Sequence, residues 1–95
     1  MQDLIVKAGQ KIGYLIPYEG SPKPKAVWSV DGTTIEPNPR VDMNVTNTHV
    51  SFEIPFSARS DSGRYTLKLI NDSGYTSCSA NVTVLGTILF FLKII

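Results

Sequence analysis

Apolar and polar residues alternate with a period of two along most of the chain. The alternation is clearest in residues 50–54 and 65–69, where every second residue is apolar. Because successive side chains of a β-strand point to opposite faces of a sheet, this pattern predicts half-buried strands. No stretch shows apolar residues recurring at helical spacing over three turns. The pattern therefore predicts an all-β fold.

Turn-forming residues divide the alternating stretches into separate strands. Asp31-Gly32 is a strong signal for a two-residue hairpin, because a type I′ turn needs positive φ at both central positions. Glycines and prolines in residues 20–24, and the polar residues 71–74, mark further turns. About seven strands are predicted, at 12–18, 27–30, 33–35, 41–45, 50–54, 65–69 and 75–85. This spacing favours a two-sheet sandwich over alternating strands and helices.

Length and charge limit the possible partners. The 95 residues, 42% hydrophobic and 18% charged, can bury one compact core, and a second domain does not fit. Nine Lys and Arg residues against eight Asp and Glu residues give a formal net charge of +1. The basic residues are dispersed, so the positive patch expected of a nucleic-acid binder is missing. We therefore expect no nucleic-acid partner.

Cys78 is the only cysteine of the chain. An internal disulfide and a cysteine-cluster metal site are therefore excluded, and the composition fits a reducing compartment. We expect the thiol to pack as a small apolar group, with a redox-sensitive thiol as the alternative. Three Asn-x-Ser/Thr triplets begin at Asn44, Asn71 and Asn81. They would suit a glycosylated cell-surface protein, but they are inert unless the chain enters the secretory pathway.

Side chains that could carry catalysis are few and scattered. His49 is the sole histidine, and no second histidine or cysteine stands near it to complete a metal site. Asp42, Glu53 and Asp61 are too dispersed along the chain to propose a carboxylate pair. A nucleophile elbow, a phosphate loop and a dinucleotide fingerprint are all missing. We expect no enzyme activity, cofactor, metal or small-molecule substrate.

Two motifs resemble the immunoglobulin fold. Trp28 follows the turn at residues 20–24 on a short central strand, and Asp61-Ser62-Gly63-Arg64-Tyr65 precedes the penultimate strand. In that fold a buried tryptophan packs between the sheets, and a corner tyrosine hydrogen-bonds to the backbone. The resemblance implies a two-sheet Greek-key sandwich. We expect Asp61 to cap backbone N–H groups at the corner.

The two cysteines that join the sheets in that family would fall here at Ile16 and Leu67. An apolar pair fills the same volume and contributes about 1.5 to 3 kcal/mol per buried side chain, comparable to a disulfide. A reducing compartment would favour this choice. The resemblance therefore implies a disulfide-free sandwich, whose structural core and tyrosine corner include Ile16, Trp28, Asp61, Gly63, Tyr65 and Leu67.

Further segments are similar to the intermediate-set (I-set) modules of titin, twitchin and projectin, over about residues 3–85. They include residues 7–11, Ile16-Pro17, 58–65 and 71–74. The resemblance implies a folded spacer, elastic element and docking surface of a giant muscle protein, located in the cytoplasm at the myofibril. It implies sarcomeric filament proteins and neighbouring immunoglobulin or fibronectin-type modules as partners.

The two ends of the chain depart from that family. The first strand is expected to be incomplete, because little sequence precedes Asp3. Residues 86–95 are mostly apolar, but they fall short of the roughly 20 residues that span a bilayer, which is evidence against a membrane partner. We favour a non-native extension over a truncated membrane segment and over an extra strand or interface segment. The alternative function is an extracellular immunoglobulin domain of an adhesion or receptor protein with a truncated anchor.

Overall fold

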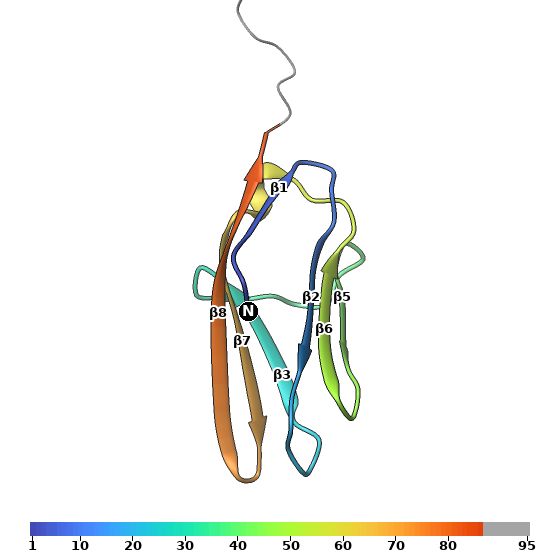
Figure 1. The fold of residues 1–95 in the computed structure, drawn as a ribbon, viewed down its shortest axis with the longest axis vertical. Helices are drawn as coiled ribbons and strands as arrows, with labels where there is room; N and C mark the ends of the chain where they lie inside the picture. The colour runs from blue at the N-terminus through green and yellow to red at the C-terminus, as the bar shows by residue number, and fades with distance from the viewer. Residues whose placement is uncertain (87–95) are drawn as a thin grey trace, which may run out of the picture.

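A computed structural model describes residues 1–86, which form two β-sheets packed face to face (Figure 1). The five-stranded sheet has the order β1 (Leu4–Lys7), β8 (Gly74–Leu85), β7 (Gly63–Asn71), β3 (Lys25–Val30) and β4 (Thr33–Thr34). The three-stranded sheet has the order β2 (Ile12–Pro17), β6 (His49–Ile54) and β5 (Asp42–Val45). A 3₁₀ turn, η1 (Arg59–Asp61), lies between β6 and β7. Of the predicted tail, 86–95, only Gly86 is among the described residues, and residues 87–95 lie outside them.

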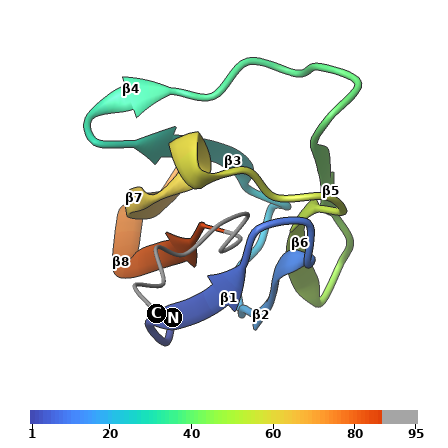
Figure 2. The ribbon, with the colours of Figure 1, turned by 90° about the horizontal axis from the view of Figure 1, so that it is seen from above.

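The predicted all-β Greek-key sandwich is confirmed. The chain crosses from one sheet to the other between β1 and β2, β2 and β3, β4 and β5, and β6 and β7. Seen from above, the two sheets form two layers, and β1 lies at the side where the five-stranded sheet approaches β2 (Figure 2). No helix in residues 1–86 is long and apolar enough to cross a membrane. The predicted domain limits, 3–85, stay a prediction.

The described residues contain eight strands, one more than the seven predicted. The additional strand is β1, which pairs in parallel with residues Val82 to Leu85 of β8. Its three consecutive apolar residues hide the period-two pattern, because the middle one, Ile5, is 74% exposed. This pairing joins segments from opposite ends of the chain, so no local sequence pattern indicates that β1 forms.

The hairpin between β3 and β4 has the predicted two-residue turn. Asp31 has a φ of 49° and Gly32 a φ of 84°, which are the positive values that a type I′ turn requires. Val30 pairs with Thr33 across the turn. The turn places Asp31 beside the start of β7, where its carboxylate accepts a hydrogen bond from the backbone N–H of Arg64.

The core lies between the sheets and consists of the inward-facing residues of each strand. Alternate residues of β2, β6, β7 and β8 are buried, as the period-two pattern predicts. The buried hydrophobic residues are Ile12, Tyr14, Trp28, Val50, Phe52, Ile54, Tyr65, Leu67, Leu69, Ala80, Val82 and Val84.

Candidate functional site

The corner tyrosine is Tyr65, near the start of β7. Its side chain is 2% exposed, and its hydroxyl donates a hydrogen bond of 2.6 Å to the backbone carbonyl oxygen of Asp61. Burial raises the pKa of the Tyr65 phenol to about 12, and the nearby negative charge of Asp61 adds to the rise. The phenol therefore acts as a neutral hydrogen-bond donor that ties β7 to η1.

The Asp61 carboxylate has two partners. Its Oδ2 accepts a hydrogen bond of 2.7 Å from the backbone N–H of Ala58, which caps the N-terminal end of η1. The Arg40 guanidinium donates to both carboxylate oxygens, at 2.7 and 3.3 Å. This contact raises the pKa of Arg40 through the hydrogen bond and the charge of Asp61. Sequence reasoning missed Arg40, because it lies 21 residues before Asp61 in a loop without any motif.

Gly63 lies where two backbone segments come close together. A Cβ atom at this position would approach the Asp31 Oδ2 atom to 2.7 Å and the Val30 Cγ2 atom to 2.8 Å. Asp31 occupies this space because its Oδ1 accepts a hydrogen bond of 2.9 Å from the backbone N–H of Arg64. The backbone N–H of Asp31 donates to the Arg64 carbonyl oxygen, also at 2.9 Å. Glycine is therefore needed to dock the β3–β4 hairpin on β7.

Trp28 lies at the centre of the core. It is 2% exposed on β3, and its ring centroid is 4.6 Å from that of Phe52 and 6.3 Å from that of Tyr14. Those two residues belong to β6 and β2 of the opposite sheet. Trp28 therefore packs between the sheets through aromatic contacts. Such contacts add to the stability that comes from burying apolar surface alone.

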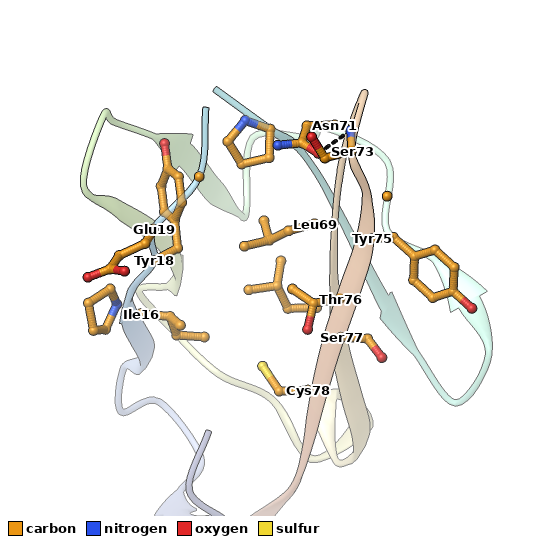
Figure 3. Close-up of a pocket in the computed structure, with 15 residues that line it drawn as sticks. Ile16, Tyr18, Glu19, Leu69, Asn71, Ser73, Tyr75, Thr76, Ser77 and Cys78 are labelled. Atoms are coloured by element: carbon orange, nitrogen blue, oxygen red, sulfur yellow. Dashed lines mark hydrogen bonds between the residues drawn. The ribbon is translucent and has the colours of Figure 1, made fainter. Parts of the chain in front are cut away.

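Ile16 and Leu67 come from opposite sheets and line the same cleft of about 430 Å³. Figure 3 shows this cleft, with Ile16 on the β2 side. Leu67 is 1% exposed, and Ile16 is half-buried against the core. On β8, Cys78 pairs with Leu67 and is half-buried, with its thiol free. In Figure 3 the side chains of Ile16 and Cys78 point toward one another across the cleft. No disulfide links the sheets within residues 1–86.

Of the polar residues weighed for catalysis, Asp61 belongs to the corner, whereas Asp42 is exposed and His49 and Glu53 are partly exposed. The Nδ1 atom of His49 lies 2.8 Å from the Thr48 hydroxyl, and residues 1–86 hold no group of three side chains suited to bind a metal ion. Contrary to the expected dispersion, Asp42 faces Glu53 across β5 and β6. Glu53 forms an exposed 3.5 Å contact with Lys11. Asp42 and Glu53 are 11 positions apart, and the strand register that brings them together could not be predicted from the sequence.

The curated relatives of this chain include myosin-binding proteins. It is 34% identical over 68 residues to "Myosin-binding protein C, fast-type" of Mus musculus, which covers 72% of this chain and 6% of that protein. It is 37% identical over 68 residues to "Myosin-binding protein H-like" of Homo sapiens, covering 72% of this chain and 19% of that protein. The chain therefore spans only a small part of the relatives it matches.

The fold is similar to solved titin domains. One is described as "Atomic resolution structure of titin domain M7", with a TM-score of 0.83 and 28% identity over 88% of this chain and 86% of that chain. Another is the "Crystal structure of the titin domains z1z2 in complex with telethonin", with a TM-score of 0.84 and 28% identity over 90% of this chain and 45% of that chain. The family model "Immunoglobulin I-set domain" matches residues 1–84. The chain thus belongs to the immunoglobulin I-set domain family.

Proposed function

We propose that this chain is a structural and protein-interaction module of a sarcomeric filament protein. In this role it acts as a folded spacer, an elastic element and a docking surface in the cytoplasm, at the myofibril. The similarity to myosin-binding proteins and to titin domains supports the proposal. We further propose that residues 3–85 form the folding unit and that residues 86–95 are an appended segment. We also propose that the module catalyses no reaction.

The observation that carries the proposal is the apolar packing of Ile16 and Leu67. Leu67 is buried in the core, Ile16 is partly buried against that core from the opposite sheet, and the nearby Cys78 has a free thiol. Full burial of an aliphatic side chain such as Leu67 contributes about 1.5 to 3 kcal/mol, and the half-buried Ile16 adds a smaller amount, so apolar burial holds the sheets together without an oxidised bond. A sandwich built in this way keeps its stability in a reducing cytoplasm.

The proposed partners are sarcomeric filament proteins and neighbouring immunoglobulin or fibronectin-type modules. Two solved titin structures are complexes, one "in complex with telethonin" and one the "Titin M10-Obscurin like 1 Ig complex". The second is 22% identical to this chain and supports the fold alone. Nucleic acids are not among the proposed partners, because the charge is nearly balanced and dispersed. Small-molecule substrates and membranes are also left out, because the sequence shows no catalytic motif and its apolar run is shorter than a membrane span.

Co-sedimentation with isolated myofibrils tests this function. We expect the purified chain to pellet with myofibrils in a saturable way and to remain in the supernatant when they are left out. An excess of unlabelled chain should displace the labelled chain. Trp28→Ala, which opens the core, serves as the control for binding by unfolded protein. Binding that does not saturate, or that Trp28→Ala retains, would contradict a docking surface on the folded module.

The alternative is an extracellular immunoglobulin domain of an adhesion or receptor protein. The specific observation in its favour is that Asn44 and Asn81 are exposed within Asn-x-Thr triplets on β5 and β8. Mass spectrometry of protein from its native tissue separates the two functions. The sarcomeric function predicts unmodified asparagines at both positions. A glycan on either would favour the extracellular function, because glycosylation occurs in the secretory pathway.

A further inference from the structure

The outward side of the five-stranded sheet gathers positive charge. Four of the nine Lys and Arg residues lie in its strands, whereas none of these strands contains an Asp or Glu residue. The strands of the three-stranded sheet show the reverse, because they contain Asp42 and Glu53 and no Lys or Arg residue. We call the outward side of the five-stranded sheet the basic face, and its cationic residues are Lys7, Lys25, Arg64 and Lys68.

The cationic side chains of β7 point into solvent. Arg64 and Lys68 are exposed, and their immediate neighbours toward the middle of β7 are buried, as side chains alternate along a strand. The Lys68 Nζ atom lies 4.4 Å from the centroid of the Tyr75 ring, which is a cation–π contact between β7 and β8. In Figure 3 the Tyr75 ring extends away from the interior cleft. On β3, Lys25 is in register with Ile70 and completes this part of the basic face.

A row of hydroxyl side chains crosses the basic face between Arg64 and Lys68. The row is in register across β4, β3, β7 and β8 and consists of Thr34, Ser29, Thr66 and Ser79. The hydroxyl oxygens of Thr66 and Ser79 are 2.9 Å apart. Only one of their two protons occupies that contact, so the other O–H can donate to an acceptor outside the sheet. The basic face therefore offers a hydrogen-bond donor between two cations.

The spacing of these groups selects the shape of a partner. Arg64 and Lys68 are four residues apart on β7, which corresponds to about 13 Å along an extended strand. An extended segment lying along β7 has the same spacing between its residues i and i+4, and its residue i+2 lies opposite Thr66. Carboxylates at these three positions would form charge-assisted hydrogen bonds with the two cations and the hydroxyl pair. Duplex DNA, with one charge per about 1.7 Å, is far denser in charge than this set of cations.

We infer that the basic face binds an extended acidic segment of a partner protein, with carboxylates at every second residue. The inference rests on the proposed cytoplasmic function, because a glycan on Asn81 would cover part of this face. Asn81 lies on it, and its Oδ1 accepts a 3.4 Å hydrogen bond from the Arg64 guanidinium. Asp3, Asp31 and Asp72 lie outside the strands, before β1 and in the two hairpin turns, and therefore border the basic face without lying on it.

Amide NMR titration of the isotope-labelled, full-length chain tests this inference. The probe is a synthetic peptide with three glutamates at alternate positions, separated by threonines. A peptide of the same composition with its glutamates in a row is the matched control, because it has the same charge and the wrong spacing. We expect saturable shift changes at amides of β7 and β8 around Thr66. The alternating peptide should bind about threefold more tightly than the control, which corresponds to one exposed ion pair.

Each alternative occupant gives a different result in this titration. Equal affinity for the two peptides would show attraction by net charge alone, and shift changes confined to β5 and β6, or no shift changes, would show that the basic face does not bind the peptide. Tighter binding of an oligothymidylate of equal length would assign the basic face to nucleic acid. Shift changes at the same amides on dilution of the chain alone would indicate a second copy as the occupant. Each of these results overturns the inference.

Single substitutions connect the basic face to the proposed function. Lys68→Gln and Arg64→Gln should each weaken binding to the alternating peptide and to myofibrils about threefold. Lys11→Gln removes the same charge just before β2, in the other sheet, and as the matched control should bind like the wild type. All three side chains are exposed, so the variants should fold, and the fluorescence of Trp28 checks this.

The failure of this inference is distinguishable from the failure of the proposed function. If the wild type pellets with myofibrils and Lys68→Gln and Arg64→Gln pellet equally well, the inference is overturned and the proposed function stands. If the wild type does not pellet, the proposed function is contradicted, and the peptide titration still decides whether the basic face binds an acidic segment.

Discussion

The hydroxyl of Tyr65 donates a 2.6 Å hydrogen bond to the backbone carbonyl oxygen of Asp61, four residues earlier in the chain. The Asp61 carboxylate, in turn, binds the backbone N–H of Ala58 and the guanidinium of Arg40. These contacts join the start of β7, η1 and the loop before β5. The corner is therefore a small network of two partly buried hydrogen bonds and one exposed ion pair, all of which involve Asp61.

Replacement of Tyr65 by phenylalanine should destabilise the fold moderately. The ring and its edge-on contact with Phe52 remain, and only the hydrogen bond to Asp61 is lost. We expect the free energy of unfolding to fall by about 1 kcal/mol, as for one buried hydrogen bond. Urea denaturation measures the change. Tyr75→Phe, at a side chain that is 72% exposed, is the matched control and should leave the stability unchanged.

The raised pKa of Tyr65 predicts a loss of stability at alkaline pH. The folded state holds this proton up to a pKa of about 12, whereas an unfolded tyrosine titrates near 10.0. The stabilisation is therefore complete below pH 10 and is lost as the pH rises toward 12, at up to about 1.4 kcal/mol for each pKa unit. Urea denaturation from pH 8 to 12 should show a steeper fall for the wild type than for Tyr65→Phe. Parallel curves would show that Tyr65 titrates as it does in the unfolded chain.

Gly63→Ala should destabilise the corner. The added methyl group would approach Asp31 Oδ2 and Val30 Cγ2 to less than 3 Å, so the β3–β4 hairpin must move away from β7. We expect a loss of about 1 to 3 kcal/mol, which is typical of overpacking. Gly13→Ala is the control, because its nearest neighbour, Lys11 Cε, is at an ordinary 3.6 Å. A melting temperature lowered equally by both changes would show that the close approach at Gly63 has no special cost.

Trp28→Ala should remove the centre of the core. Trp28 contacts Phe52 and Tyr14 across the sheets, and its loss leaves a large cavity. We expect a loss of about 3 to 5 kcal/mol in denaturant unfolding. Leu15→Ala, at a side chain that is 68% exposed, should change the stability by less than about 0.5 kcal/mol. Because Trp28 is the only tryptophan, acrylamide quenching of native fluorescence reports on its burial directly, and efficient quenching would contradict the packing.

The sequence was sufficient to predict most of the fold, because its signals are local. Alternation identifies β6 and β7, and Asp31-Gly32 identifies the hairpin after β3. The contacts that complete the corner were not predictable in this way. Arg40 meets Asp61 across 21 residues, and Asp31 meets Arg64 across 33. Such pairs depend on how the sheets pack. Arg40 and Asp31 do not belong to a repeating sequence pattern that would have indicated their partners.

We propose that this chain is a disulfide-free immunoglobulin I-set module that works inside muscle cells. Immunofluorescence of the native protein in isolated, intact muscle fibres, with an antibody raised against this chain, tests that proposal most directly. The account predicts transverse bands that repeat with the sarcomere and that appear only after the cells are permeabilised. Staining of unpermeabilised cells at their surface, without sarcomeric bands, would contradict it.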